Sequence, residues 1–424
     1  MAATTQKLNY ANVPPRATSS RALRNEVVPS NGSEFQFNNT IIFDLPSNLN
    51  NTFWDAQSSY VSLVVNNTDD TYDVNFEGGG FPACIKRIVI ELGGQTLFSC
   101  DNWNSLYMAM FDLDTAEQFR INAGDVLFGA SNDAKGALIG EGESLKVCFP
   151  LVLTPFMANK YFPLIGRDRI RIRLELDTAH RSLICENAAV LDSDITITDV
   201  KLVQYNLELG SDVMAQVAAA SGGSFKIACP SYQHHQSTIA AGASSLSATL
   251  GFSMSSLNRV IVLQQLQTVA ATAAYIGNRS HAGLERFSVS VGGIKYPQID
   301  LKEDGSGSET LAEALISQRA LTSWGHQSSV NLGAGFNANE PTGGAGATAS
   351  TGHYLVDLDL ESQRVAGGES GMGLVAGVNT IGQVVQAQLN YDNGVTAAHS
   401  LNIYAEHTLL CMLDLNSLTW SIAV

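Results

Sequence analysis

The sequence predicts an all-β protein built from two consecutive units of similar design. Runs of alternating apolar and polar residues recur along the whole chain, without the regular strand-helix alternation of a βαβ protein. The chain has 424 residues, too long for one ordinary β core and suited to two domains of roughly 200 residues each. Charged residues make up 15% of the chain, against about 25% in typical soluble domains. Such a composition suits β-sheets and broad protein contacts.

The first unit opens with a series of strand-like runs. In one of them Ile88, Ile90 and Leu92 point to one side, and the pair Gly93-Gly94 then turns the chain into the next run. The runs that precede the last strand of this unit are 34–45, 60–65, 85–92, 95–100, 144–153, 159–165 and 169–177.

A helix is predicted directly after the run 95–100, with Asp101 or Asn102 as its cap. Its apolar residues follow the i, i+3, i+4, i+7 spacing of one helical face. They are Trp103, Leu106, Tyr107 and Met110. An aromatic stripe of this kind favours core packing over a ligand site.

The run 169–177 alternates strictly, and its outward face carries Arg169, Arg171 and Arg173. Three arginines on one strand face could bind an anion. The interpretation that we favour is a charged outer face that meets an acidic neighbouring subunit. The three arginines are therefore candidate subunit-contact residues.

The first unit closes in the segment 194–223. Residues 195–209 alternate as a long half-buried strand does, and Ser211 is then a candidate N-cap for a helix over 211–220. Gly222 and Gly223 end that helix. This pattern predicts a closing strand followed by a helical linker at 210–223.

The second unit repeats this order of events. Its strand-like runs are 224–229, 245–252, 259–266, 286–291, 354–360, 383–391 and 401–415. Gly292-Gly293 follows the run 286–291, and a helix opened by a capping box of Thr310 and Glu313 comes after it. The segment 333–352, rich in glycine and alanine, is predicted to be an extended surface loop.

Two landmarks measure the repeat. Gly93 corresponds to Gly292, an offset of 292 − 93 = 199, and Leu209 corresponds to Leu415, an offset of 415 − 209 = 206. We interpret the agreement as an internal duplication of a unit of roughly 200 residues. About eight strands per unit, with one helix in a long connection, favour two tandem eight-stranded antiparallel jelly-roll sandwiches. The predicted domains are jelly roll 1 at 34–209 and jelly roll 2 at 224–424.

The N-terminal residues 1–33 are predicted to form a flexible arm without a fold of its own. Their local charge is 4 − 1 = +3, whereas the whole chain has a net charge of −16. The charged residues of the arm are Lys7, Arg16, Arg21 and Arg24, against Glu26 alone. The acidic body should repel nucleic acid and anionic lipid. Arg16, Arg21 and Arg24 are candidates for contact with a neighbouring subunit or an inner surface.

The six cysteines are widely spread and form no C-x-x-C pair, which favours buried free thiols over a disulfide framework. The N-terminus lacks a secretory signal pattern, and no run of 18 apolar residues occurs. We therefore expect a soluble protein that is made inside the cell and does not insert itself into a membrane.

Residues that could carry catalysis are poorly arranged in the sequence. The segment 368–371, Gly-Glu-Ser-Gly, lacks the second glycine of a nucleophile elbow, and 344–346 lies in low-complexity sequence that does not form a phosphate-binding loop. We therefore predict neither an enzyme nor a bound cofactor. Paired glycosidase carboxylates stay open, because their pairing is spatial.

The weak metal candidates are Asp357 and Asp359, which share one strand face near His353 and could bind calcium. Outward-facing carboxylates without a metal are the interpretation that we favour, so no metal site is predicted.

Three further histidines also favour structural roles. His234 and His235 are adjacent and point to opposite faces of a strand. His407 falls in the apolar register of the last strand, which favours a core or inter-subunit histidine over a catalytic one.

Several stretches together resemble one protein family. The stretch 85–107 contains the Gly-Gly turn and the aromatic helix, 159–165 precedes the Arg/Ile strand, and 287–297 precedes a helix containing alanine and glutamate. In their order they resemble the double jelly-roll major capsid proteins of tailless icosahedral viruses, including membrane-containing phages and polinton-like viruses. The resemblance spans about residues 34–415.

The resemblance implies a structural capsid protein that is neither an enzyme nor a sequence-specific nucleic-acid binder. Three copies would supply six jelly rolls and form a pseudo-hexagonal capsomer that tiles an icosahedral virion shell. Its partners would be further copies of itself, penton and minor capsid proteins, and an internal membrane where the virion has one. The chain would be made in the host cytoplasm, and the loop 333–352 would face outward.

An alternative from another class stays open. The chain could be a carbohydrate-binding or glycoside-cleaving β-sandwich protein, such as a receptor-binding spike. That alternative gives Asp357 and Asp359 a role in binding glycan.

Overall fold

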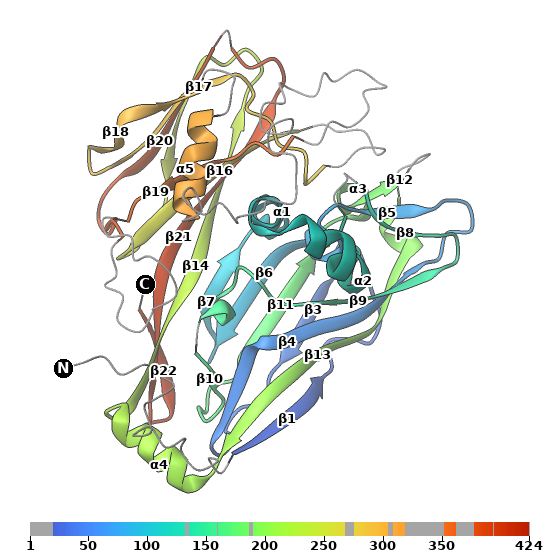
Figure 1. Cartoon of the computed structure of the whole chain (residues 1–424), viewed down its shortest axis with the longest axis vertical. Helices are drawn as coiled ribbons and strands as arrows, with labels where there is room; N and C mark the ends of the chain where they lie inside the picture. Colours follow the sequence, from blue (N-terminus) through green and yellow to red (C-terminus); the bar gives the residue numbers. More distant parts are fainter. Residues whose placement is uncertain are drawn as a thin grey trace, which may run out of the picture.

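The computed structural model contains two β-sandwiches that lie side by side (Figure 1). It describes residues 20–131, 135–158, 160–185, 190–267, 275–303, 308–318, 352–361, 377–392 and 394–423. We call residues 20–209 roll 1 and residues 224–423 roll 2. The fold class predicted from the sequence, two tandem antiparallel jelly rolls, is confirmed.

Roll 1 contains two large sheets and a small one. The first, here called the β13 sheet, has the order β1-β13-β4-β10, with β2 also paired to β13 and β9 to β4. Its strands are β1 Ser20–Val27, β2 Phe35–Gln36, β4 Thr52–Asn67, β9 Ser144–Phe149, β10 Phe162–Pro163 and β13 Ile195–Leu209. The second sheet has the order β3-β11-β6-β7. Its strands are β3 Thr40–Asp44, β6 Ile85–Leu92, β7 Gln95–Cys100 and β11 Ile170–Leu176. The small sheet joins β5 Val74–Glu77, β8 Lys135–Ile139 and β12 Leu183–Cys185.

Roll 2 repeats this topology. Its first sheet, here called the β21 sheet, has the order β14-β21-β16-β19, with β22 also paired to β21, and its second sheet has the order β15-β20-β17-β18. The strands are β14 Ser224–Ile239, β15 Ser245–Leu250, β16 Leu257–Leu266, β17 Leu284–Val291, β18 Ile294–Lys302, β19 Val356–Asp359, β20 Val385–Tyr391, β21 His399–Asp414 and β22 Thr419–Ala423.

The helices lie in the connections. They are α1 Trp103–Asp114, α2 Asp125–Phe128, α3 Ala179–Ser182, α4 Ser211–Ala220 and α5 Ser308–Ser317. Short irregular turns of helix are η2 Phe81–Cys84, η3 Phe119–Gly124, η4 Pro155–Met157 and η5 Asp192–Asp194. The first helix after the glycine turn is α1 in roll 1 and α5 in roll 2, so the helices follow the repeat as well.

The two glycine turns have the same backbone geometry. Gly93 and Gly94 have φ values of 59° and 82°, and Gly292 and Gly293 have φ values of 57° and 85°. A two-residue hairpin of this kind needs positive φ at both central positions, which glycine adopts without steric cost. The matching turns join β6 to β7 and β17 to β18, which lie at equivalent places in the two rolls.

The N-terminal arm is shorter than the sequence analysis predicted. Residues 20–27 are β1, which pairs along its whole length with β13, from Ser20 opposite Leu209 to Val27 opposite Leu202. In the order of the sheet, β1 occupies the place that β14 has in roll 2, so it is the first strand of roll 1. Its residues are mostly exposed and polar, which made an edge strand look like a tail. Lys7 and Arg16 lie outside the described residues.

Three smaller predictions were also wrong. The predicted run 401–415 is not the last strand of roll 2, because β22 folds back on β21 as a hairpin. Helix α5 begins at Ser308, and the Thr310 hydroxyl does not cap it but donates to Glu303 (2.6 Å). Gly210, not Ser211, occupies the N-cap position of α4. The predicted surface loop 333–352 lies almost wholly outside the described residues.

Helix α1 is buried on all sides. Every residue from Trp103 to Leu113 is buried, although the sequence predicted only one apolar stripe. The reason is its position, since one side packs on the core of roll 1 while the other faces roll 2 (Figure 1). The aromatic stripe does pack in the core, where the Trp103 and Tyr107 rings stack with centroids 5.2 Å apart.

Candidate functional site at the junction of the two rolls

Buried polar contacts join the two rolls around Glu77, at the end of β5. Its carboxylate accepts three hydrogen bonds from backbone N–H groups of roll 2, those of Tyr275 (2.6 Å), Ile276 (2.9 Å) and Gly277 (2.7 Å). Burial raises the pKa of Glu77 to about 7, and the three N–H groups act in the opposite direction. The segment 275–277 of roll 2 has no regular structure. Glu77 therefore supplies the hydrogen-bond acceptors that its buried backbone N–H groups need.

A second junction contact is a buried ionic cluster around Asp112 of α1. Its carboxylate pairs with Arg120 of roll 1 (3.0 Å) and with Arg279 of roll 2 (2.6 Å), and His353 Nδ1 lies 3.0 Å from Asp112 Oδ2. Burial alone would raise the pKa of Asp112, but His353, Arg279 and Arg120 together hold it well below its usual range. The carboxylate thus stays ionised between two guanidinium groups from different rolls.

The N-terminal end of α1 makes neutral polar contacts with the outer face of the β21 sheet. Asn102 Nδ2 donates to Asn402 Oδ1 (3.1 Å), and the Tyr404 hydroxyl donates to the carbonyl of Asn102 (2.7 Å). The Ser105 hydroxyl donates to Gln265 Oε1 (3.2 Å). Asn102 occupies the predicted cap position, yet its side chain makes no capping bond and serves the junction instead.

The C-terminal hairpin adds a contact at the other end of the junction. The backbone N–H of Trp420 in β22 donates to Asp168 Oδ2 of roll 1 (2.9 Å), and the N–H of Arg167 donates to the carbonyl of Leu418 (2.9 Å). The Trp420 indole packs so closely on Gly166 that a Cβ there would lie 2.8 Å from the indole nitrogen. The two rolls are therefore joined by β22 of roll 2 as well as by α1 of roll 1.

The weak metal candidates have a different role. Asp357 is fully buried, not outward-facing, and its carboxylate pairs with Arg259 (3.3 Å) and accepts from Ser317 (2.8 Å). Burial raises the pKa of Asp357 to about 6. Asp359 accepts from the backbone of Glu361 (2.9 Å), and His353 pairs with Asp112 instead. Within the described segments no group of three or more histidine, cysteine, aspartate or glutamate side chains could hold a metal ion.

The arginines of β11 are engaged within roll 1. Arg171 pairs with Asp44 of β3 (2.7 Å), and Arg173 pairs with Glu91 of β6 (2.7 Å). Both carboxylates belong to neighbouring strands of the same sheet, so their charge is matched inside the chain. Arg169 is exposed and stays the candidate of the three for contact with another subunit.

The described arginines of the N-terminal segment also bind their own chain. Arg21 pairs with Glu208 of β13 (3.1 Å), and Arg24 pairs with Glu26 of its own strand (2.9 Å). All four side chains are 41% exposed or more, so these pairs add little to stability.

His234 and His407 make packing and hydrogen-bond contacts within the fold. His234 Nε2 lies 3.0 Å from Asn402 Oδ1, and its ring stacks on Tyr404 with centroids 4.7 Å apart. His407 is buried in the β21 sheet, and burial lowers its pKa to about 4. All six cysteines are free, and all but Cys148 are buried.

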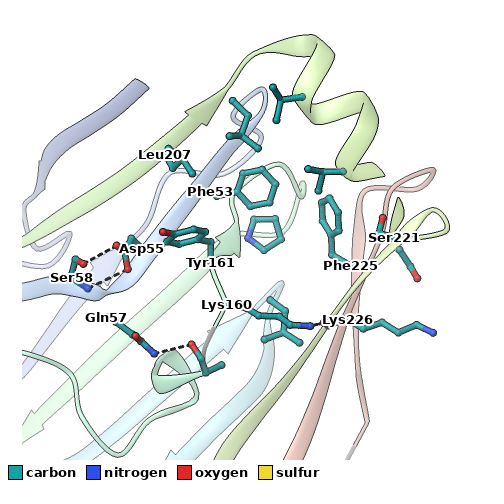
Figure 2. A pocket seen from close by; sticks show the side chains of 17 residues that line it. Phe53, Asp55, Gln57, Ser58, Lys160, Tyr161, Leu207, Ser221, Phe225 and Lys226 are labelled. Atoms are coloured by element: carbon teal, nitrogen blue, oxygen red, sulfur yellow. Dashed lines mark hydrogen bonds between the residues drawn. The ribbon is translucent and has the colours of Figure 1, made fainter. Parts of the chain in front are cut away.

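A groove lies beneath α4 (Figure 2). It encloses about 880 Å³, and the rings of Phe53 in β4, Phe225 in β14 and Tyr161 just before β10 point into it. No residue of α4 is buried, and Val213 and Val217 of that helix contribute to the lining. The helix is thus a loosely packed connector across the base of both rolls. None of the helices within the described segments is long and apolar enough to cross a membrane.

The sequence analysis missed the junction because its partners lie far apart in the chain. Asp112 and Arg279 are separated by 167 positions, and Glu77 and Gly277 by 200. One signal was present for Asp112, a carboxylate within a helix whose neighbours are mostly apolar. No comparable signal marks Glu77, because the acceptors and donors of irregular backbone leave no pattern in the sequence.

Known proteins resemble this chain in fold but not in sequence. No protein-family model matches the chain, and no curated protein sequence matches it. Solved structures do share the fold. The PBCV-1 virus capsid has a TM-score of 0.63 at 13% identity, covering 98% of this chain and 99% of that chain. The Sputnik virophage structure has a TM-score of 0.61 at 9% identity, covering 100% and 93%. The Faustovirus major capsid protein has a TM-score of 0.60 at 10% identity, covering 95% and 92%.

Proposed function

We propose that the chain is a major capsid protein, a structural subunit that assembles as homotrimers into pseudo-hexagonal capsomers of an icosahedral virion shell. One observation carries the proposal: the chain matches a viral capsid chain over 98% of its own length and 99% of the other's. A match over both full lengths includes the pairing of the two rolls as well as the fold of each one.

The contacts between the two rolls support a structural role in a shell. Asp112 and Glu77 join roll 1 to roll 2 through buried contacts, and β22 adds a partly buried one, so the two rolls form one block. A shell subunit needs such a block, because its outer surfaces must keep a fixed angle to their neighbours.

The surface supports self-association. Apolar side chains with exposed fractions above 50% are found on both rolls, and contact with other subunits would remove them from water. They include Val126 (77%), Leu138 (56%), Ile294 (60%), Ile299 (79%), Ile381 (55%) and Val384 (59%).

Its partners in this proposal are further copies of the chain, penton and minor capsid proteins, and an internal membrane where the virion has one. The chain is made in the host cytoplasm and resides in the virion. Its role is structural and not enzymatic, without a cofactor or sequence-specific nucleic-acid binding. The proposed contact residues are Arg16, Arg21, Arg24, Arg169, Arg171 and Arg173. Arg169 is exposed, and Arg16 lies outside the described residues.

The glycan-binding alternative loses one of its two named residues. It requires Asp357 to reach a sugar, but that side chain is buried and paired with Arg259. Changing Asp357 would disturb the β21 sheet before it affected a ligand.

The test is the oligomeric state of the purified full chain. Native mass spectrometry should give a mass of three chains, and electron microscopy of assembled material should show capsomers with pseudo-hexagonal outlines. A chain that stays monomeric at all concentrations and never assembles would overturn the proposal.

A further inference from the structure

The groove beneath α4 is lined by apolar side chains that are partly open to solvent. Tyr161 is 51% exposed and Val217 of α4 is 37% exposed, while Phe225 and Leu207 are half-buried. All four line the groove, and the rings of Tyr161 and Phe225 point into the same space as the ring of Phe53 (Figure 2). Roll 1, roll 2 and α4 thus each contribute apolar surface to one groove.

The size and charge of the groove suit a short apolar segment. Its volume of about 880 Å³ lies within the range of roughly 300–1,000 Å³ that is usual for ligand pockets. The charged lining residues are Asp55, Lys160 and Lys226, with a net charge of 2 − 1 = +1. Lys160 Nζ donates to the carbonyl of Lys226 (3.1 Å), and Asp55 accepts from the Ser58 hydroxyl (2.7 Å). Charge therefore does not favour a basic occupant, and the apolar surface decides what fits.

The N-terminal segment joins the described chain at the edge of this groove. Residues 1–19 lie outside the described residues, and Ser20 lies opposite Leu209, which lines the groove. Because β1 is antiparallel to β13, the chain enters β1 at the end of the sheet where β13 leads into α4. Residues 13–15 are five to seven positions from Ser20, at most about 25 Å of extended chain. They can therefore reach the groove.

The composition of this segment fits the apolar lining. Residues 13–15 are Val-Pro-Pro. Prolines have no backbone N–H, so their burial leaves no donor without an acceptor. Consecutive prolines also hold an extended polyproline conformation before they bind, which lowers the entropic cost of binding. Grooves lined by aromatic rings are a common binding site for such segments.

We propose that the Val-Pro-Pro sequence at 13–15 binds in the groove beneath α4 of its own chain, against the three aromatic rings. The bound segment joins roll 1, roll 2 and α4 at a place where α4 itself has no buried residue. The contact lies within one chain, so it does not depend on the proposed function.

Trypsin cleavage of the purified full chain tests this contact. The bond between Arg16 and Ala17 directly follows the bound residues. It should be cut about tenfold more slowly in the chain than in a synthetic peptide of residues 8–20, because cleavage requires release of the segment. Tyr161→Ser removes an exposed ring from the groove and should abolish the protection. The control Phe119→Ser removes a ring that is 43% exposed elsewhere in roll 1 and should keep it.

A second variant tests whether the two sides of the contact act together. Val13→Asp places a carboxylate among the rings, and its cleavage rate is compared with that of a peptide carrying the same substitution. The double variant Val13→Asp/Tyr161→Ser should lose no more protection than either single variant, since both changes break one contact. Circular dichroism melts and native mass spectrometry of each variant show whether the fold and the oligomeric state are intact.

Several results would overturn the assignment. They are cleavage of the wild-type chain at the rate of the peptide, protection that a folded Tyr161→Ser variant retains, and additive losses in the double variant. Protection that falls on dilution would place the segment in the groove of another copy. Protection that is lost in about 1 M salt would mean a contact through charge and not through the apolar lining. None of these results bears on the shell function, which the mass of the oligomer tests separately.

Discussion

Arg279 of roll 2 donates to Asp112 of α1 at 2.6 Å, and both side chains are 2% exposed or less. The contact places a charge from each roll inside one junction. Since Arg120 also pairs with this carboxylate, removing Asp112 would leave two buried guanidinium groups without their common partner.

We expect Asp112→Ala to destabilise the chain by about 3–5 kcal/mol, the cost of an uncompensated buried charge. Urea unfolding of the purified chain measures it. The matched control is Arg21→Ala, which breaks an exposed ion pair with Glu208 and should cost no more than about 1 kcal/mol. An equal loss of unfolding free energy in the two variants would show that the buried ion pair stabilises the chain no more than the exposed one.

Glu77→Ala should loosen the segment of roll 2 that Glu77 holds. Three backbone N–H groups, from Tyr275 to Gly277, would lose their acceptor, at a cost of about 1–3 kcal/mol for each group that stays buried. Hydrogen exchange at these three amides should become at least tenfold faster. Glu141→Ala, at an exposed position of roll 1, is the control. Unchanged exchange in Glu77→Ala would mean that the carboxylate does not hold the segment.

His407 should make the chain sensitive to acid. Burial lowers its pKa to about 4 in the folded chain, against about 6.5 for an unfolded histidine. A histidine with a lowered folded pKa stabilises the fold above pH 6.5, and this contribution of about 3 kcal/mol is lost as the pH falls from 6.5 to 4.

His407→Leu should therefore flatten the fall in the free energy of unfolding between pH 6.5 and pH 4, measured by urea titration at each pH. His180→Leu is the control, because His180 is exposed. A wild-type and a His407→Leu chain with parallel pH profiles would contradict the assignment.

Ala215→Pro should impair trimer formation more than the folding of either roll. Proline at the fifth residue of α4 removes a helical hydrogen bond and distorts the helix, at a cost of about 3 kcal/mol to the helix itself. Because no residue of α4 is buried, the cores of both rolls should keep their melting temperature. Native mass spectrometry measures the trimer fraction, with Ala215→Ser as the control. A lower melting temperature with an unchanged trimer fraction would reverse the expected order.

The strands and the repeat could be predicted from the sequence because their signals are local. Alternation of apolar and polar residues indicates a strand wherever one face is buried, as in 195–209, which is β13. The glycine pairs at 93–94 and 292–293 mark hairpins because few other residues adopt positive φ at both positions. From such local signals the two jelly rolls and the helix between them followed.

The exposed edge strand β1 escaped prediction for a related reason. An edge strand with little buried surface has no apolar alternation, and its pairing with β13 depends on residues that are 202 − 27 = 175 to 209 − 20 = 189 positions away. Strand β22 was missed for the same reason, because it is held by its pairing with β21 and by its contact with Asp168 and not by a local pattern.

The sequence by itself determined the fold class, the duplication and the buried free cysteines, since each depends on residues that are near in sequence or on composition. The tertiary structure alone decided which polar side chains serve the junction. In the sequence Asp357 has the pattern of an outward carboxylate, but in the structure it pairs with Arg259. Asp112 is one charge on a helix in the sequence, and in the structure it pairs with Arg279. Burial of a charge depends on which distant partner neutralises it, and that pairing exists only once the two rolls have packed together.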